Sequence, residues 1–496
     1  MTIFSSRQSV AAAWIAATVE TVGGRSDIFR YETVKRVLGH PLFWLSLVIA
    51  VTIGALAAGG GLEPQKTPDT LSFLKAAELG TLVEALANYR SMGYPAFLRL
   101  VVTPEQWLSR VPVVQVGLYF LSLYLFWFAV ERLSGSGWFA FAATLPLPWA
   151  GVMTLANVIQ PDFSAAVATI VAISCLMLLV TGPSKIVWGV GVAVGVFAAY
   201  QLRPAAVFLV AMVPLLGVGV RWLRDRGDWR GILRWSVGLA ALTLVPYLLF
   251  CGLRWVAVGH FGVVSFGGTN LAGIAASFVD GRVVRELPQE HRALARRFMS
   301  RRAQMGWKPM RRESDIIEYF GQYSDNIWRV ARPAGKRTYR ENRQRVAEKF
   351  GDSHWDPRPE EVVLNEMLGS ASKAIIRLKP KHYFKWVTDA IVLGLRHLLD
   401  YAWIVAPLLV VLLSLPILLL RQGANAQASE ARRSARTPAL LALLILGVGY
   451  FAAYLLLVSL VSFPAYRYFV SMTLFLPSAI CVQLFEIWRR ILTPGA

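Results

Sequence analysis

The sequence has few charged residues, few cysteines and few histidines. Only 16% of its 496 residues are charged, against about a quarter in a typical soluble domain, whereas 55% are hydrophobic and the mean hydropathy is +0.49. Cys175, Cys251 and Cys481 lie far apart inside apolar runs, a pattern that argues against a disulfide framework and provides no Cys-x-x-Cys metal site. No pair of the six histidines has the spacing of a zinc site on a helix. The sequence also lacks a Walker phosphate loop and a Gly-x-Ser-x-Gly nucleophile motif.

Acidic residues are scarce as well. The chain has 30 Asp and Glu against 51 Lys and Arg, which gives a formal net charge of +21. In a soluble protein this excess would suggest nucleic-acid binding. In a chain this apolar, basic residues instead collect in cytoplasmic loops and beside anionic headgroups. We therefore expect membrane lipids as partners and no nucleic acid.

Long apolar runs dominate the sequence. A helix needs about 20 apolar residues to cross the hydrocarbon core of a bilayer. Ten segments meet or approach this length: 42–60, 112–131, 137–157, 163–181, 186–201, 204–222, 235–256, 401–420, 438–460 and 468–488. The sequence predicts an all-α polytopic membrane protein with about ten transmembrane helices. The first forty residues carry charges and lack the pattern of a cleavable signal peptide, so the first span is expected to be an uncleaved anchor.

Basic residues in the short loops predict the orientation. In a ten-span arrangement they fall on one side, at Arg132, Lys185, five arginines within 221–234, four within 421–436, and Arg489 and Arg490. Because such residues mark cytoplasmic loops, both termini are expected in the cytoplasm. The opposite side then receives the segments 61–111, 157–163, 200–204, 257–385 and 462–468.

These observations divide the chain into three parts. Residues 1–256 form an N-terminal transmembrane module with a first loop at 61–111, and residues 386–496 form C-terminal transmembrane helices. Between them lies a basic insert, 257–385, which contains 24 basic and 14 acidic side chains and is predicted to be a mostly helical outside subdomain. Amphipathic juxtamembrane helices are expected at 71–89, at 95–108 and at 370–399 with a break at Pro380.

The insert contains one stretch, 294–310, in which arginines and lysine alternate with aromatic and apolar residues. One interpretation is a solvated helical face near anionic headgroups. The other is a contact for phosphate or an acidic glycan. The sequence leaves both open.

Two carboxylates flank apolar spans on the predicted outside face. Asp69 follows Pro68 directly after the first span, and Asp162 follows Gln160 and Pro161 in a tight turn between the third and fourth spans. Either could be an ordinary helix N-cap. Because intramembrane and juxtamembrane charges in such proteins often mark functional sites, their common side also makes them candidate site residues.

Two arginines lie at the same predicted level. Arg203 follows Tyr200 between two apolar spans, and Arg467 lies between Tyr466 and Tyr468 before the last span. Snorkelling of Arg203 towards the headgroups and interfacial anchoring at Arg467 are the structural explanations. The functional explanation is phosphate binding, because a guanidinium forks well onto phosphate oxygens.

Two carboxylates and two arginines together suit the transfer of a group from a lipid phosphate. A carboxylate can act as general base on an acceptor hydroxyl, and guanidinium groups can stabilise the charge of the departing phosphate. The glycines Gly189, Gly191 and Gly195 resemble a nucleotide-binding pattern only superficially, because they fall within a predicted span. Their spacing indicates close helix packing instead.

The arrangement resembles the integral-membrane type C glycosyltransferases, in the bacterial group that includes aminoarabinose transferases and protein mannosyltransferases. The resemblance rests on the order and sidedness of Pro68-Asp69-Thr70, Gly93-Tyr94-Pro95, Asp162, Leu202-Arg203-Pro204 and Arg467-Tyr468. It implies a bacterial cytoplasmic-membrane enzyme with its active site on the periplasmic or extracellular side. The implied donor is a polyprenyl-phosphate-linked sugar, transferred with inversion to a lipid or glycan acceptor.

The resemblance also implies roles for individual residues. Asp69 would be the catalytic base and Asp162 a second acidic residue of the site. The lipid phosphate would be bound by Arg203, Arg467 and Tyr468, and the substrate loop would include Tyr94, Tyr200 and Gln160. A divalent cation, Mg²⁺ or Mn²⁺, is a candidate cofactor, with Asp69 and Asp162 as its ligands if it is present.

Two other classes share part of this pattern. A transporter or flippase for a lipid-linked glycan could use the same charges to line a pathway, although such proteins often contain inverted repeats and mid-membrane broken helices, and no repeat is found here. A ligase or polymerase that joins glycans from lipid carriers would share the basic outside face. Catalysis by sugar transfer is the favoured hypothesis because the charges cluster at one membrane face.

Overall fold

The protein is an all-α polytopic membrane protein, as the sequence predicts. The computed structural model describes residues 37–102, 108–224, 229–311, 315–350, 356–400 and 430–492, with positions 407 and 409. Within these residues nine segments are long and apolar enough to cross a membrane: Pro41–Ala58, Arg110–Ser134, Gly137–Leu155, Pro161–Thr181, Lys185–Leu202, Pro204–Leu223, Trp229–Val258, Arg436–Val461 and Tyr466–Arg489. Eight of them match a predicted span to within three residues at each end, and Trp229–Val258 begins six residues before the predicted segment 235–256. The predicted span 401–420 lies outside the described residues, apart from positions 407 and 409.

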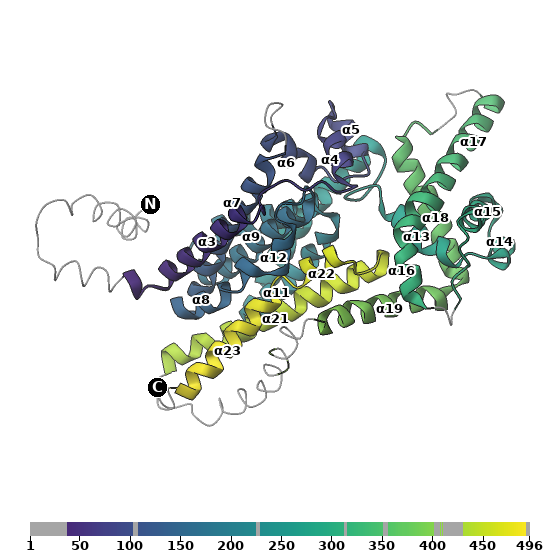
Figure 1. Cartoon of the computed structure of the whole chain (residues 1–496). Coiled ribbons are helices and arrows are strands. Elements are labelled where there is room, and N and C mark those ends of the chain that lie inside the picture. The colour runs from purple at the N-terminus through teal and green to yellow at the C-terminus, as the bar shows by residue number, and fades with distance from the viewer. Residues whose placement is uncertain are drawn as a thin grey trace, which may run out of the picture.

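The membrane part and the polar parts occupy different regions of the molecule (Figure 1). The membrane part comprises α3 (Pro41–Ala58), α7 (Arg110–Ser134), α8 (Gly137–Thr144), α9 (Pro161–Thr181), α10 (Lys185–Leu202), α11 (Leu209–Arg224), α12 (Trp229–Val258), α21 (Glu430–Val461), α22 (Tyr466–Met472) and α23 (Leu476–Leu492). The first loop contains α4 (Thr70–Ala77), α5 (Leu82–Ala87) and α6 (Gly93–Val101). The insert contains α13 (Gly267–Phe278), α14 (Gly281–Glu286), α15 (Gln289–Gln304), α16 (Ile316–Asp325), η5 (Asn326–Ala331), α17 (Arg332–Phe350) and α18 (Glu360–Leu378), and α19 (Pro380–Leu399) returns to the bundle.

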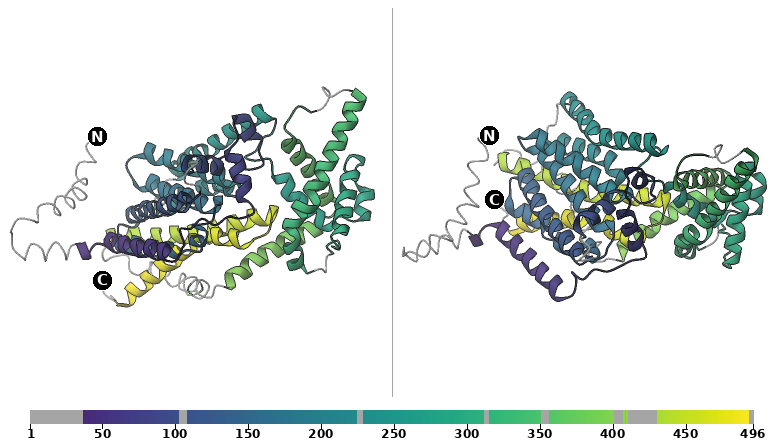
Figure 2. Two further views of the ribbon diagram at one scale, coloured as in Figure 1. Left: turned by 45° about the horizontal axis from the view of Figure 1, so that its top comes forward. Right: turned by 90° about the horizontal axis from the view of Figure 1, so that it is seen from above.

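The first loop and the insert lie at the same end of the helix bundle. Figures 1 and 2 show α4, α5 and α6 at the end of the bundle that carries the insert, whereas α23 ends at the opposite end of the bundle. The break predicted at Pro380 separates α18 from α19, because proline has no amide hydrogen to continue the helix. The amphipathic helix predicted at 71–89 is divided into α4 and α5.

The third span is α-helical only in its first half. Helix α8 ends at Thr144, and two short 3₁₀ segments follow, η2 (Leu147–Trp149) and η3 (Gly151–Leu155). Pro146 and Pro148 explain the change, since each removes a backbone donor and clashes with the preceding turn of an α-helix. The predicted span 137–157 is matched by the candidate span Gly137–Leu155, which the prolines divide into an α-helical part and a 3₁₀ part.

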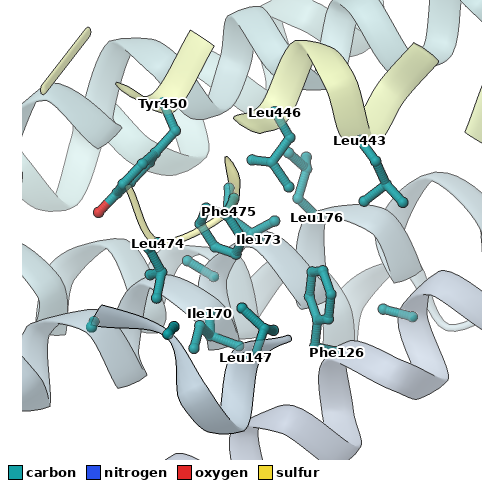
Figure 3. Close-up of a cluster of buried hydrophobic side chains, with 14 of the residues drawn as sticks. Phe126, Leu147, Ile170, Ile173, Leu176, Leu443, Leu446, Tyr450, Leu474 and Phe475 are labelled. Atoms are coloured by element: carbon teal, nitrogen blue, oxygen red, sulfur yellow. The ribbon is translucent and has the colours of Figure 1, made fainter. Parts of the chain in front are cut away.

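Helix α9 lies at the centre of the bundle core. Eighty-nine per cent of its most apolar window is buried, the largest share of any candidate span in the described chain. Figure 3 shows its side chains between α7 and the C-terminal helices, with these residues labelled: Phe126, Leu147, Ile170, Ile173, Leu176, Leu443, Leu446, Tyr450, Leu474 and Phe475. The burial fixes α9 firmly, and with it the first turn of α9, which carries Asp162.

Close packing of α10 on α9 depends on two of the glycines noted in the sequence. A Cβ atom at Gly195 would lie 2.9 Å from the backbone of Ala172, and one at Gly191 would lie 2.6 Å from Sγ of Cys175. Small residues allow membrane helices to approach closely. The glycines therefore serve packing, as their position within a span predicted.

The insert has a hydrophobic core of its own. It is centred on α13 and includes Phe278, Phe298, Leu364, Leu368 and Trp386 among its buried side chains. Within 294–310, Arg302 is buried and donates hydrogen bonds to the carbonyl oxygens of Ala276 (2.6 Å) and Val279 (2.8 Å). Arg297 pairs with Glu341 of α17. Two of the basic residues in this stretch thus hold the insert together, a role that neither interpretation from the sequence included.

Candidate functional site

Asp69 is held by two arginines from distant parts of the chain. It occupies the N-cap position of α4, but its side chain makes no capping hydrogen bond. Instead, Nη2 of Arg90 donates to Oδ1 of Asp69 at 2.6 Å, and Nη1 of Arg467 donates to Oδ2 at 3.0 Å. Helix capping therefore does not explain this carboxylate.

The segment before Asp69 is attached to the turn that precedes Asp162. The backbone amide of Gln65 donates to the carbonyl oxygen of Asn157 (2.8 Å), and the amide of Ile159 donates to the carbonyl oxygen of Gln65 (2.9 Å). The hydroxyl of Thr70 also donates to the carbonyl oxygen of Ile159 (3.1 Å). These bonds fix the position of Asp69 relative to the first turn of α9.

Asp162 and Arg203 form a buried ion pair. Asp162 lies in the first turn of α9 and is 1% exposed, and Arg203, at the end of α10, is 7% exposed. Nη1 of Arg203 contacts Oδ1 of Asp162. Because the guanidinium is buried against a carboxylate, snorkelling to the headgroups does not account for Arg203.

Tyr468 connects the two ion pairs. Its ring centroid lies 4.6 Å from Cζ of Arg203 and 5.3 Å from Cζ of Arg467. Guanidinium groups near an aromatic ring are attracted by its quadrupole. We call the set that results the arginine–carboxylate cluster; it consists of Asp69, Arg90, Asp162, Arg203, Arg467 and Tyr468.

The arginine–carboxylate cluster has an excess of positive charge. Three guanidinium groups face two carboxylates, so ionised side chains leave one positive charge without a carboxylate inside the cluster. Accessibility differs within the set, because the side chain of Arg467 is 40% exposed and that of Arg203 is 9% exposed. An anion entering the site would therefore meet Arg467 before Arg203.

The pKa of Asp69 reflects the same balance. Burial raises it, but the charges of Arg90 and Arg467 and their hydrogen bonds outweigh burial and lower the pKa below its ordinary value of 3.8. Asp69 is thus a carboxylate at neutral pH, and a weak base while both arginines hold it.

The carboxylates do not fit a divalent cation. Mg²⁺ takes about six oxygen ligands in near-octahedral geometry, whereas Asp69 and Asp162 are each already paired with guanidinium groups. Within the described ranges no three His, Cys, Asp or Glu side chains gather as a ligand set. Arginine side chains, and not a metal, thus balance the charge of both carboxylates.

Tyr94 contacts the arginine–carboxylate cluster indirectly, through Phe73. It is fully buried, and its ring packs edge-on against Phe73 at 5.2 Å, whose own ring lies 4.4 Å from Cζ of Arg90. The hydroxyl of Tyr94 lies 3.5 Å from Oε1 of Gln115, which also accepts a hydrogen bond from Ser164 at 3.0 Å. Tyr94 therefore helps to position Arg90 through Phe73.

Tyr200 packs in a helix interface, and Gln160 directly precedes the first turn of α9. The ring of Tyr200 is buried between Phe197 (5.3 Å) and Tyr247 (5.9 Å), in the interface of α10 and α12. Gln160 is the N-cap residue of α9 and is 5% exposed, and its side chain makes no capping bond. Of the predicted residues, the structure brings Asp69, Asp162, Arg203, Arg467 and Tyr468 together, with Tyr94 one layer away.

Arg90 is the member of the cluster that sequence reasoning missed. It lies between α5 and α6, and with Asn88, Ser91 and Arg99 it lines a cleft of about 210 Å³ in the first loop. One signal could have identified it, since Arg90 follows Tyr89 just as Arg467 follows Tyr466.

Gly93 allows the first loop to approach this site. A Cβ atom there would lie 2.5 Å from the carbonyl carbon of Gln201 and 2.7 Å from the amide nitrogen of Leu202. The hydroxyl of Ser91 donates to the carbonyl oxygen of Leu202 at 3.3 Å. The start of α6 is thereby fixed to the residues directly before Arg203.

The fold and the cluster define a class of protein: a polytopic helical membrane protein with a cluster of arginines and carboxylates near one end of its bundle. Comparison with known protein families, curated proteins and solved structures finds no match.

Proposed function

We propose that the protein is a membrane glycosyltransferase that moves a sugar from a polyprenyl-phosphate-linked donor to a lipid or glycan acceptor, with inversion. The observation that carries the proposal is Asp69, a half-buried carboxylate held between Arg90 and Arg467. The carboxylate of Asp69 suits a general base, and the two guanidinium groups suit the binding of the departing phosphate. The proposed location is the cytoplasmic membrane of a bacterium, with the cluster on the periplasmic or extracellular side and both termini in the cytoplasm.

The proposed reaction is a single displacement. The acceptor oxygen forms a bond to the anomeric carbon, and the bond between that carbon and the phosphate oxygen breaks with its electron pair going to the phosphate. Asp69 takes the proton of the acceptor hydroxyl. Guanidinium groups stabilise the charge that develops on the phosphate. No acid is required on that side, because a phosphate leaves as an anion.

Exchange of arginine partners would activate Asp69. In the structure its two arginines make it a weak base. A donor phosphate would compete for Arg467, the more exposed of the two, whose side chain is 40% exposed against 16% for Arg90. Losing one guanidinium raises the pKa of the carboxylate, so Asp69 becomes a stronger base when the donor is bound.

Reconstitution tests the proposal. Protein in liposomes is given polyprenyl-phosphate-linked mannose, glucose or aminoarabinose together with a glycolipid extract of bacterial envelopes, and free polyprenyl phosphate is measured. Asp69→Asn should lower turnover by a factor of about 10² to 10⁴, the usual contribution of a general base. The matched control is Asp389→Asn, because Asp389 is a carboxylate of similar exposure (25% against 26%) that pairs with Lys385 on α19.

Three outcomes would contradict the proposal. Wild-type turnover in Asp69→Asn would remove Asp69 as the base. Movement of the donor across the bilayer without release of polyprenyl phosphate would indicate a transporter. Joining of whole glycans from two lipid carriers would indicate a ligase or polymerase.

A further inference from the structure

Three aromatic rings meet where the first loop contacts the insert. Tyr89 lies 5.8 Å from Phe266 and 6.2 Å from Trp328, and Phe266 and Trp328 are 5.9 Å apart, measured between ring centroids. Tyr89 follows α5, Phe266 is the N-cap residue of α13, and Trp328 lies in η5. We call these three residues the aromatic triad.

A charged pair borders the aromatic triad. Cζ of Arg332 lies 4.6 Å from the ring centroid of Tyr89 and 5.3 Å from that of Trp328. Nη2 of Arg332 donates to both carboxylate oxygens of Glu361 at 2.7 Å. The other terminal nitrogen, Nη1, is buried and has no hydrogen-bond partner in the described chain, although Arg332 is only 7% exposed.

Packing between the loop and the insert does not explain these features. Trp328 is 39% exposed although it contacts two other rings, and Glu361 retains 26% of its side-chain exposure. A buried donor without a partner is costly in a purely structural contact. Half-exposed rings beside a charged donor and a charged acceptor are instead typical of a site for a small polar ligand.

A sugar ring has the matching chemistry. The C–H groups on one face of a pyranose pack against the electron-rich face of an aromatic ring. Its hydroxyl groups can donate to a carboxylate and accept from a guanidinium, and charged partners make these hydrogen bonds strong. Trp328 supplies an exposed ring and Glu361 the acceptor, and Arg332 holds Glu361 in place beside the rings.

The position of the aromatic triad relative to Asp69 indicates whether it binds the donor or the acceptor. Tyr89 is followed by Arg90, which pairs with Asp69. Arg90 bonds Oδ1 of Asp69, whereas Arg467 of α22, the proposed contact for the donor phosphate, bonds Oδ2. A glycan on the triad would therefore lie next to the arginine that bonds Oδ1, and the donor phosphate next to the arginine that bonds Oδ2.

We propose that the aromatic triad, with Arg332 and Glu361, binds the carbohydrate part of the acceptor. The inference rests on the proposed glycosyltransferase activity and gives the insert a function within it. Acceptor specificity then depends on residues of the insert, whereas the donor is bound by the membrane part.

Two substitutions of Trp328 separate binding from packing. Trp328→Met fills space without an aromatic face, and Trp328→Phe keeps a face. The control is Phe261→Met, at a 56% exposed aromatic residue in the segment before α13. Turnover is measured against dilutions of the envelope glycolipid extract, and donor hydrolysis to water is measured without extract. Binding of the oligosaccharides released from that extract by mild acid is measured separately by saturation-transfer NMR.

In Trp328→Met we expect half-saturation by the extract to need about tenfold more glycolipid, in keeping with one lost aromatic contact. Hydrolysis of the donor should be unchanged, Trp328→Phe should stay near the wild type, and the NMR signal of the oligosaccharides at one fixed low concentration should fall several-fold in Trp328→Met. Equal half-saturation and equal NMR signals in wild type and Trp328→Met would overturn the inference while leaving the transferase intact. A wild-type protein that releases no polyprenyl phosphate would instead contradict the proposed function, and the NMR arm would still decide carbohydrate binding.

Discussion

Asp69 accepts a hydrogen bond from Arg467, which lies 398 residues further along the chain, at 3.0 Å. The bond joins the first loop to the last membrane segment. Arg90 completes the arrangement from the same loop as Asp69. The site is therefore formed only when the two ends of the transmembrane region have come together, and its charge balance can be altered from either end.

The pH dependence of catalysis should report that balance. Arg90 and Arg467 hold the pKa of Asp69 below 3.8 in the free enzyme, so the acid limb of kcat/KM should lie below that pH. In Arg467→Met only Arg90 remains to lower the pKa of Asp69 against the effect of burial. That pKa should rise, and the acid limb should move to higher pH. The measurement is the pH profile of polyprenyl phosphate release.

The same shift affects stability in a defined direction. Because the folded-state pKa of Asp69 is below its unfolded value, ionised Asp69 contributes stability above the unfolded pKa, and the contribution is lost as pH falls through the folded pKa.

Arg282→Met is the control for the pH profile of Arg467→Met, since Arg282 is 76% exposed on α14 and pairs only locally with Glu286. An acid limb that stays in place in Arg467→Met would show that Asp69 is not the titrating base.

Asp162 and Arg203 allow stability and catalysis to be separated. Removing one partner of a buried ion pair leaves an uncompensated charge and costs about 3–5 kcal/mol. We expect Asp162→Asn and Arg203→Met each to lower the free energy of unfolding by such an amount, and the double variant to lose much less than the sum. Turnover should remain low in the double variant, because the proposed phosphate contact is gone.

Denaturant unfolding of the detergent-solubilised protein gives the coupling energy. The exposed pair Arg282 and Glu286 is the reference, for which the coupling should be about 0.3–0.5 kcal/mol. Additive losses at Asp162 and Arg203 would mean that the pair is not coupled in solution. Recovered turnover in the double variant would assign both residues to folding alone.

Much of the fold could be predicted from the sequence because membrane spans follow from one-dimensional runs of apolar residues. The nine candidate spans of the described chain match predicted segments. Within these spans the chain changes from α-helix to 3₁₀ structure after α8. Pro146 and Pro148 indicate this change, but the average hydropathy of the segment does not. Local rules of backbone chemistry decide such breaks, and average hydropathy does not register them.

The candidate site could be predicted only in part. Sidedness placed Asp69, Asp162, Arg203 and Arg467 at one level, and the structure brings these four together. Which arginine pairs with which carboxylate depends on contacts between residues far apart in sequence. Arg90 was missed for this reason, since its role is set by a loop that folds back onto Asp69.

Gly93 tests whether the first loop must lie close to Arg203. A Cβ atom would overlap the backbone of Gln201, with 2.5 Å to its carbonyl carbon and 2.6 Å to its carbonyl oxygen. Backbone atoms cannot move aside as a flexible side chain can, so Gly93→Ala should push α6 away from the end of α10. Overpacking of this kind costs about 1–3 kcal/mol, and a displacement of about 1 Å at a catalytic group can cost 10²-fold in rate.

Gly117→Ala is the matched control, because it adds the same methyl group in α7 where no atom lies within 4 Å of the new Cβ. It should be neutral or slightly stabilising, since alanine favours helix more than glycine does. Thermal unfolding and turnover are measured for both variants. Equal unfolding temperatures and equal turnover in Gly93→Ala and Gly117→Ala would show that the first loop need not lie close to Gln201. Other contacts would then have to hold Arg90 against Asp69.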